Sequence, residues 1–391
     1  MEPELQIGRR ILLGPGPSDV HPRVLRAMSM PLVGHLDPEF VALMERVKRM
    51  LREVFRTKNR LTLPLSATGS AGMEAVMVNL LEPGDTAVIG VAGVFGGRIA
   101  EVARRAGAEV TQIEVPWGEV IEPARFASAL ATLASQGKPA RLAAVVHAET
   151  STGACQPLEE IGRIAREHGA LFVVDAVTSL AGRPLEIDAW GVDACYSGTQ
   201  KCLSCPPGLS PVTFSDAAVE RIRGRSRPVQ SWYLDLSLLE QYWGDSRVYH
   251  HTAPITMNYA LHESLRVVLE EGLERRFERH RRNHEALVAG LEALGLEMAV
   301  AAQHRLPMLN AVRVPEATDE AAVRARLLER HGIEIGAGLG PWKGRVWRIG
   351  LMGESSTPQN VLLVLAALGE AMGAVTTGDA LAAAEQVLAR P

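Results

Sequence analysis

Short apolar runs alternate with segments of helical spacing between residues 60 and 230. At residues 72–81 apolar side chains recur three and four positions apart, which is typical of a helix. Continuous apolar runs predict five strands, at residues 86–91, 109–115, 141–148, 170–174 and 193–197. The alternation predicts an α/β fold, with a mostly parallel sheet covered on both faces. Several strands end in Gly, Ser, Thr or Asp. These polar ends should lie along one edge of the sheet, and the active site is expected there.

The pattern changes after residue 270 and predicts a second, smaller α+β domain. A long charged helix is expected from residue 264 to residue 294, its Arg and Glu run forming a solvated face. The domain continues with strands at 310–314 and 346–349 and helices at 320–330 and 358–372. An Ala-rich segment at 378–389 predicts an appended terminal helix that packs on a partner. We therefore divide the chain into an N-terminal segment (1–20), a large domain (21–270) and a small domain (271–391).

Composition narrows the class of protein. With 391 residues, 47% of them hydrophobic, the chain can bury the cores of two domains. A formal charge of −4 argues against nucleic acid or an anionic membrane as the main partner and favours a small-molecule substrate. Residues 1–5 lack the features of a secretory signal and no long apolar run follows, so a cytoplasmic location is expected. Four cysteines are too few for a disulfide framework, and Cys202-x-x-Cys205 lacks a second pair for a metal site.

Lys201 closes an apolar strand in the run Ser197-Gly198-Thr199-Gln200-Lys201, among small and hydroxylated side chains. A Schiff-base lysine must lose its proton readily, and a crowded pocket achieves this. A lysine in a surface turn explains these five residues equally well. Asp175 ends the preceding apolar strand, where open α/β sheets bind ligands. It could be a helix N-cap, or it could pair with the pyridinium nitrogen of pyridoxal phosphate. The two residues together favour the catalytic interpretation.

Thr68, Gly69 and Ser70 precede the helix at 72–81 and offer hydroxyls and free backbone N–H groups to an anion such as phosphate. Tight turns and nucleotide folds share this pattern, but neither dinucleotide nor P-loop fingerprint is present, which disfavours a dehydrogenase. Phe95 lies among glycines that leave its face open for stacking on a flat ring, or it is a core phenylalanine.

Two further residues suit substrate or cofactor contacts. Thr150 follows another strand and could donate a hydrogen bond to a cofactor hydroxyl, although turn capping explains it almost as well. Arg348 lies in an apolar strand, and a buried guanidinium needs an anionic partner. A substrate carboxylate would suit its fork, and so would a structural Asp or Glu.

These residues, in this order, resemble the class V aminotransferases of fold type I, specifically the alanine–glyoxylate and serine–pyruvate aminotransferases. The likeness spans nearly the whole chain, and the motif at 249–252 is especially specific. Its motifs are Gly14-Pro15-Gly16-Pro17-Ser18, Leu80-Leu81-Glu82-Pro83-Gly84-Asp85, Glu149-Thr150-Ser151-Thr152-Gly153, Ser197-Gly198-Thr199-Gln200-Lys201, Tyr249-His250-His251-Thr252 and Arg348-Ile349-Gly350-Leu351.

The resemblance implies a seven-stranded, mostly parallel sheet, pyridoxal 5′-phosphate as cofactor and a homodimer with shared active sites. It implies Lys201 as the Schiff-base residue and proton shuttle and Asp175 as the pyridinium partner. The other cofactor contacts that it implies are Thr68, Gly69, Ser70, Phe95, Thr150, Val177 and Gln200, with Tyr249 and Thr252 donated by the neighbouring subunit. Gly16, Thr150 and Arg348 are the implied substrate contacts. His250 and His251 are implied to be structural, and no metal is expected.

The implied reaction is a ping-pong transfer of the amino group of a small L-amino acid, alanine or serine, to glyoxylate or pyruvate. Phe95 stands where the animal enzymes carry tryptophan, and Ser70 where they carry histidine. The ureidoglycine–glyoxylate aminotransferases are similar at residues 34–38 and 269–273. That branch carries glutamine in place of His35 and asparagine in place of Tyr249, which puts ureidoglycine in doubt as the donor.

Other functions remain open at this point. A 2-aminoethylphosphonate–pyruvate aminotransferase is a further class V alternative. A cysteine desulfurase needs a nucleophilic cysteine late in the chain, and none follows Cys205. A catalytically silent assembly subunit with the same fold is a non-enzymatic alternative, against which intact Lys201, Asp175, Gln200 and Arg348 argue.

Overall fold

The computed structural model describes residues 4–390. Its central element is a sheet of seven strands in the order β2-β10-β9-β8-β5-β3-β4. β10 is antiparallel to both of its neighbours and all other pairs are parallel, which confirms the predicted mostly parallel sheet. The strands are β2 (Leu61–Leu65), β3 (Thr86–Val91), β4 (Glu109–Glu114), β5 (Leu142–Val146), β8 (Leu171–Asp175), β9 (Ala194–Tyr196) and β10 (Ser210–Phe214).

Two of these strands, β2 and β10, escaped prediction from the sequence. Each contains a proline, which ordinarily argues against a strand interior. The two strands pair with each other, and Pro64 lies directly opposite Pro211. β2 is an edge strand, where proline is tolerated, and the Pro211 carbonyl faces the end of β9, where it accepts from the Ser197 N–H at 2.8 Å, so neither proline interrupts a continuous ladder.

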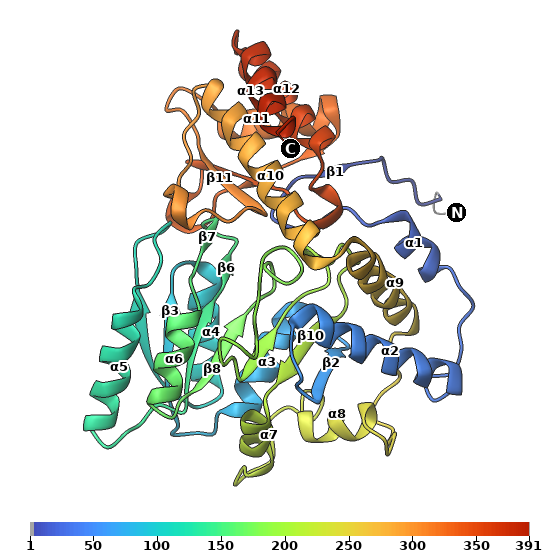
Figure 1. The fold of residues 1–391 in the computed structure, drawn as a ribbon, viewed down its shortest axis with the longest axis vertical. Helices are drawn as coiled ribbons and strands as arrows, with labels where there is room; N and C mark the ends of the chain where they lie inside the picture. The colour runs from blue at the N-terminus through green and yellow to red at the C-terminus, as the bar shows by residue number, and fades with distance from the viewer. Residues whose placement is uncertain (1–3, 391) are drawn as a thin grey trace.

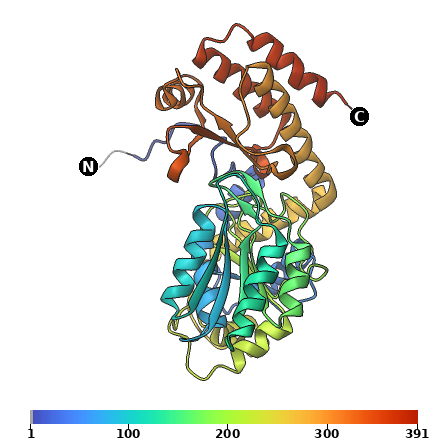
Figure 2. The ribbon, with the colours of Figure 1, turned by 90° about the vertical axis from the view of Figure 1, so that its left-hand side faces the viewer.

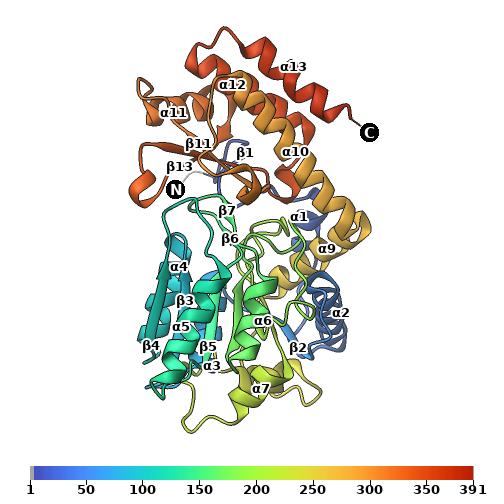
Figure 3. The same cartoon turned by 60° about the vertical axis from the view of Figure 1, so that its left-hand side comes forward.

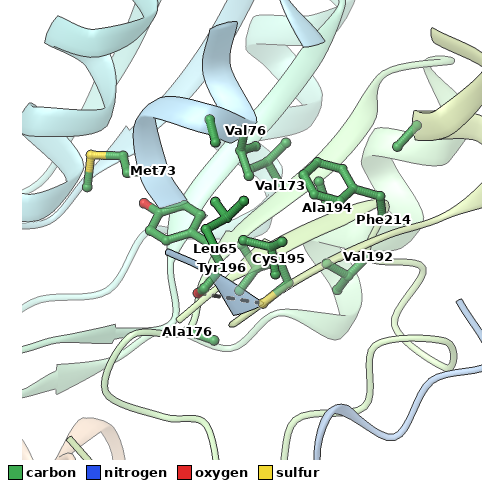
Figure 4. Packing of buried hydrophobic residues seen from close by; sticks show 14 of the residues in the cluster. Leu65, Met73, Val76, Val173, Ala176, Val192, Ala194, Cys195, Tyr196 and Phe214 are labelled. Carbon is green, nitrogen blue, oxygen red and sulfur yellow. Dashed lines mark hydrogen bonds between the residues drawn. The ribbon is translucent and has the colours of Figure 1, made fainter. Parts of the chain in front are cut away.

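Helices cover both faces of the sheet (Figure 2). α3 (Gly69–Leu80) and α4 (Val94–Arg105) pack on one face, α5 (Pro123–Ser135) and α6 (Glu159–Glu167) on the other. Figure 4 shows Met73 and Val76 of α3 among buried side chains of the strands, so the apolar stripe of this helix is core packing. Four further helices, α1 (Pro22–Met28), α2 (Pro38–Phe55), α7 (Asp216–Arg223) and α8 (Leu236–Trp243), complete this part of the molecule, with a hairpin of β6 (Ala148–Glu149) and β7 (Ala154–Cys155).

The long charged helix predicted from residue 264 is two helices, α9 (Ile255–Glu271) and α10 (Leu273–Ala293). Gly272, between them, has φ 84° and ψ 135°, a conformation that favours glycine and interrupts the helical hydrogen bonds. The solvated face predicted for the Arg and Glu run is also wrong at one position, because Arg276 is fully buried.

The small domain has a three-stranded antiparallel sheet in the order β11-β14-β13, formed by β11 (Leu309–Arg313), β13 (Gly336–Ala337) and β14 (Val346–Gly350). The N-terminal strand β1 (Ile11–Leu12) pairs in parallel with β12 (Ile333–Glu334). The small domain's helices besides α10 are α11 (Glu320–His331), α12 (Pro358–Met372) and α13 (Thr377–Leu388), with 3₁₀ helices at Ala302–His304, Gly340–Trp342 and Gly353–Ser355.

The terminal helix α13 lies along α10 and α12 of its own chain (Figure 3). Its apolar side chains Ala380, Ala384 and Val387 are buried in the core of the small domain. The prediction that this helix packs on a partner is therefore wrong for its apolar face.

Two separate hydrophobic cores underlie this arrangement. One is built from residues between 24 and 268, the other from Leu13 and residues between 286 and 387. The small domain lies over one edge of the seven-stranded sheet (Figure 1). The division of the chain at residues 20 and 270 stays a prediction. Among residues 4–390, none of the helices has the length and apolar character to cross a membrane.

Candidate active site

A cavity of about 220 Å³ lies at the carboxyl ends of β5 and β8 and at the start of α3. It is lined by Thr68, Gly69, Ser70, Met73, Phe95, Arg98, Val146, Ala148, Thr150, Asp175, Val177, Thr178, Gln200 and Lys201. Nine of these are predicted site residues, drawn from five separate segments of the chain. A larger cavity, of about 660 Å³ around His147 and Trp190, contains none of them, so chemistry rather than size identifies the site.

The loop that carries Lys201 is clamped by side chains from three distant segments. Ser18 Oγ donates to the Lys201 carbonyl at 2.7 Å, Arg276 to the Cys202 carbonyl at 2.7 Å and Ser264 Oγ to the Leu203 carbonyl at 2.5 Å. Each of these carbonyls is satisfied by a side chain rather than by helix or sheet, so the backbone beside the lysine is fixed in place.

Lys201 is partly buried, and its amine donates a hydrogen bond to the Pro15 carbonyl. Burial lowers its pKa to about 8, and the positive charge of Arg348 acts in the same direction. An amine with a lowered pKa is partly unprotonated near neutral pH. A nucleophilic lysine needs this unprotonated form. The setting is that of a reactive lysine and excludes the surface turn considered above.

Titration should show directly that the pKa of Lys201 is lower than that of an exposed lysine. After reductive methylation with ¹³C-formaldehyde, one lysine signal of the apoprotein should titrate near pH 8, whereas exposed lysines titrate at about pH 10.4. The signal is assigned by its loss in a Lys201→Arg variant. A Lys201 signal that titrates with the exposed lysines would contradict the burial described here.

Gly16 lies against the Lys201 amine. Its φ of 109° favours glycine, and a Cβ there would lie 2.5 Å from Lys201 Nζ. We expect Gly16→Ala to displace the amine and to lower activity about 100-fold, since misplacement of a reacting group by about 1 Å has effects of that order. Gly84→Ala is the control, because Gly84 has φ 91° but no atom within 4 Å of the position of its Cβ. Equal activities of the two variants in a steady-state assay would contradict the assignment.

Asp175 ends β8 and is 3% exposed. One carboxylate oxygen accepts from the Val177 N–H at 2.9 Å and the other from the Tyr196 hydroxyl at 2.8 Å. Burial nevertheless raises its pKa to about 6. A buried acid of this kind is stabilised in its charged form by a cation in the cavity, such as a protonated ring nitrogen.

The start of α3 presents unsatisfied donors to the cavity. The N–H groups of Ala71 and Gly72 bond to the Thr68 carbonyl, and the Thr68 side chain makes no capping hydrogen bond. The Gly69 and Ser70 N–H groups and the Thr68 hydroxyl are thereby left for an anion at the positive end of the helix. The Gln200 side chain also has a buried amide oxygen without a partner within residues 4–390. With its amide turned over, its NH₂ group would be a further donor.

The walls of the cavity suit a flat ring. Phe95 and Val177 both line it, and Thr150, which is 3% exposed, also reaches it. Arg98 is a cavity residue that the sequence analysis missed, and its guanidinium carbon lies 5.0 Å from the centre of the Phe95 ring. Its spacing of three residues from Phe95 on one helix is the signal that could have found it.

Arg348 comes from β14 of the small domain and is 7% exposed. Its Nε donates to the Ala337 carbonyl at 2.7 Å and its Nη1 to the Thr150 carbonyl at 3.0 Å. No carboxylate of residues 4–390 forms an ion pair with it, which removes the structural-acid alternative. It does not line the cavity itself, but its charge acts on the Lys201 amine, so the two lie in one electrostatic environment.

Two predicted cofactor contacts lie outside this cavity. Tyr249 is 59% exposed, with its ring centre 5.2 Å from that of His35, and Thr252 is also exposed. His250 and His251 share a 2.8 Å contact between their Nδ1 atoms, and His251 Nε2 lies 2.7 Å from Ser66 Oγ. Within the described chain no three His, Cys, Asp or Glu side chains are grouped as metal ligands.

Cys202 and Cys205 are both buried free thiols. Burial raises the pKa of Cys202 to about 12, and it also raises the pKa of Cys205. Thiols with raised pKa values are poor nucleophiles, so this C-x-x-C segment is packed structure.

The cavity therefore offers what pyridoxal 5′-phosphate requires. A reactive amine, a buried acid and a cluster of free N–H and hydroxyl donors surround the walls formed by Phe95 and Val177. Adding a Cβ at Gly69 would bring it within 3.3 Å of Val177 and 3.4 Å of Gly198, so the donor cluster lies close to the ring walls. Once turned over, the Gln200 amide would donate from its NH₂ group to an anion at the same place.

Comparison with known proteins gives a consistent result. The sequence model of the family described as aminotransferase class-V matches residues 12–341. The crystal structure of alanine–glyoxylate aminotransferase from Nostoc sp. is 49% identical, with a TM-score of 0.93, covering 95% of this chain and 97% of that one. That of ureidoglycine–glyoxylate aminotransferase from Bacillus subtilis is 44% identical, with a TM-score of 0.96, covering 99% of this chain and 100% of that one. The alanine–glyoxylate aminotransferase of Callithrix jacchus is 41% identical over 94% of this chain and 89% of its own length. The chain belongs to the class V aminotransferases, transaminases that depend on pyridoxal 5′-phosphate.

Proposed function

We propose that this enzyme transfers the amino group of a small L-amino acid, alanine or serine, to glyoxylate or pyruvate. The observation that carries the proposal is the partly buried, readily deprotonated amine of Lys201, which lines one cavity with Asp175 and feels the positive charge of Arg348. Relatives named alanine–glyoxylate aminotransferase, at 41% and 49% identity, support the substrate class.

Each residue has a distinct role in this proposal. When bound, pyridoxal phosphate supplies an electron sink for the bonds to the substrate Cα. The ring nitrogen would be held by Asp175, the phosphate by Thr68, Gly69, Ser70 and Gln200, the ring faces by Phe95 and Val177, and the ring hydroxyl by Thr150. The amine of Lys201 takes the proton from the substrate Cα as a general base and returns a proton as an acid. A pKa of about 8 lets it do both near neutral pH.

Arg348 orients the substrate. Its Nε and Nη1 are held by backbone carbonyls, while Nη2 makes no hydrogen bond within residues 4–390. A guanidinium fixed in this way can offer its free side to the substrate carboxylate without losing further side-chain entropy. The Gly16 backbone, which lies on the Lys201 amine, would form the opposite wall of the substrate site.

We also propose that two chains complete each site. Tyr249 and Thr252 are exposed and do not line the cavity of their own chain. Both would instead contact the cofactor phosphate in the site of a neighbouring subunit. Large apolar side chains exposed nearby on this chain include Leu32, Leu36, Trp232, Tyr233 and Val248. Exposed apolar groups of this kind mark surfaces that bury against a partner. A Tyr249→Ala variant should bind pyridoxal phosphate more weakly while its own cavity stays intact.

A half-reaction screen tests the proposed donor. Single amino acids are added to the holoenzyme without an acceptor, and the decay of the cofactor absorbance is followed. Alanine or serine should react fastest, and glyoxylate should then restore the spectrum. Failure of both amino acids, with rapid reaction of another donor, would overturn the substrate assignment but not the chemistry.

A second candidate is transfer from ureidoglycine to glyoxylate. It is favoured by the Bacillus subtilis relative, which covers 99% of this chain with a TM-score of 0.96. His35 and Tyr249, whose rings lie 5.2 Å apart, stand at the two positions where that branch carries amides, and this difference argues against ureidoglycine as the donor. Ureidoglycine in the same screen decides between the two candidates.

Arg348→Gln should raise the KM for the amino donor more than it lowers kcat. Loss of charge-assisted hydrogen bonds worth about 1.5–3 kcal/mol predicts an increase of about 10- to 100-fold. Steady-state kinetics with Arg345→Gln as control, an exposed arginine of the same domain, measure the effect. A KM unchanged in Arg348→Gln would remove this residue from the substrate site.

A further inference from the structure

The carboxylate of Glu149 has no role in the function proposed above. It is 2% exposed and lies at the end of β6, one residue before the cavity residue Thr150. One of its oxygens accepts from the Phe95 N–H at 3.1 Å and from the Gly96 N–H at 3.3 Å. The other accepts from the Ser151 N–H at 3.1 Å and the Ser151 hydroxyl at 2.5 Å.

These bonds complete the first turn of α4 from another part of the chain. The N-cap of α4 is Gly93, which has no side chain to offer. The Val94 N–H donates to Ser151 Oγ at 3.0 Å, so with Glu149 the β6 turn satisfies three N–H groups of the helix start. A helix start needs such acceptors, and a carboxylate also interacts favourably with the positive end of the helix.

The close approach is built into the backbone. A Cβ at Gly93 would lie 2.6 Å from Glu149 Cγ and would also collide with Ser151 Oγ. The carboxylate and the helix start are therefore in contact only because residue 93 is glycine. No Lys or Arg of residues 4–390 forms an ion pair with Glu149, so its partners are the donors of α4 and Ser151.

The same turn also binds the small domain. The residue after Glu149 is Thr150, whose carbonyl accepts from Arg348 Nη1. One side of the turn thus holds Phe95 in place through its backbone, and the other side holds Arg348. The ring wall for the cofactor and the cation for the substrate are joined through two consecutive residues.

We propose that Glu149 is a positioning residue that sets Phe95, Thr150 and Arg348 relative to one another, and that it thereby determines the affinity for cofactor and substrate. The inference rests on the proposed function, because it assumes that Phe95 and Arg348 contact these ligands. The charge of Glu149 also contributes, after burial, to the raised pKa of Asp175.

Glu149→Gln keeps the size of the side chain and removes its charge, and one of its two acceptor oxygens becomes a donor that faces N–H or O–H groups. We expect the Kd of the apoprotein for pyridoxal phosphate to rise at least 10-fold, and the KM for the amino donor to rise several-fold. Because the charge of Glu149 raises the pKa of Asp175, the acid limb of cofactor binding should shift to lower pH in the variant. Absorbance titration of the apoprotein at a series of pH values measures both effects.

Asp319→Ala is the matched control. Asp319 caps α11 by accepting from the Ala322 N–H at 3.0 Å, in the small domain and away from the cavity. The Asp319→Ala variant should have a lower thermal unfolding midpoint and an unchanged Kd for pyridoxal phosphate. If Glu149→Gln lowers the midpoint by as much as the control does, yet keeps the wild-type Kd, KM and pH dependence, Glu149 is only a structural cap and the proposal is overturned.

Two further results distinguish a failure of this inference from a failure of the proposed function. Wild-type protein that binds no pyridoxal phosphate would overturn the proposed function itself. If Glu149→Gln does not fold, Ser151→Ala removes only the acceptor of the Val94 N–H and the hydroxyl donor to Glu149. Its Kd should rise several-fold, and an unchanged Kd would contradict the proposal.

Discussion

Replacement of Lys201 by alanine should reduce transamination to below about 10⁻⁴ of the wild-type rate, because general base catalysis and amine attachment are lost together. No other amine can substitute, since every side chain that lines the cavity beside Lys201 lacks one. The rate is measured as glycine formed from glyoxylate, with alanine or serine as donor. Lys58→Ala is the control, because Lys58 is exposed and its side chain makes no hydrogen bond.

The same variant separates the chemistry from the binding of the cofactor. After reduction with borohydride, wild-type protein should retain pyridoxal phosphate on unfolding, and Lys201→Ala protein should release it. The phosphate contacts proposed at the start of α3 do not depend on the lysine, so the variant should still bind the cofactor reversibly. Covalent retention in the variant would show that another residue carries the cofactor.

Arg276→Ala should lower the free energy of unfolding by about 1–3 kcal/mol, the cost of leaving the buried Cys202 carbonyl without its donor, because Glu271 is part-exposed and keeps Arg279 as a partner. The Arg276 guanidinium is fully buried and bonds Glu271 at 2.5 Å and the Cys202 carbonyl at 2.7 Å. Its loss leaves a carboxylate and a carbonyl without this donor, beside the loop that holds Lys201. Denaturant unfolding measures the change. Arg275→Ala, which removes an exposed guanidinium, is the control and should cost under about 1 kcal/mol.

This ion pair also predicts a dependence on pH. Burial alone would raise the pKa of Glu271, but hydrogen bonds and charges from Arg279 and Arg276 lower it to about 2. A folded-state pKa below the unfolded value means that the stabilisation is present above about pH 4.5 and is lost as the pH falls toward 2. Wild-type stability should therefore fall over that range, and that of Arg276→Ala should fall less. Parallel pH profiles for the two proteins would contradict this account.

The sequence predicted those elements in which local pattern and tertiary environment agree. β3 begins at Thr86 and ends at Val91 as expected, because a strand buried on both faces is a continuous apolar run. β2 and β10 were missed because each contains a proline, and only the sheet order shows that β2 is an edge strand and that Pro211 faces the end of β9. Gly272 was read as part of a helix because a single glycine is tolerated there, and only its positive φ shows the break.

The site was predictable to a similar degree. Asp175 ends β8, and Lys201 lies in the loop that follows the neighbouring parallel strand β9, so the topology brings the two residues to one edge of the sheet. The burial of Arg276 was not predictable, because a run of charges is ordinarily solvated, and the turn at Gly272 is what moves Arg276 beneath the lysine loop. Tyr249 and Thr252 lie on the surface of the single chain, and their proposed role depends on a second subunit.

The N-terminal segment connects the two domains in a way that bears on the catalytic amine. β1 belongs to the small domain through its pairing with β12, and three residues later the Pro15 carbonyl accepts a hydrogen bond from Lys201. Rotation of the small domain away from the sheet would therefore draw this carbonyl off the amine. Any opening of the two domains would thus be accompanied by a change in the hydrogen bonding of the Lys201 amine.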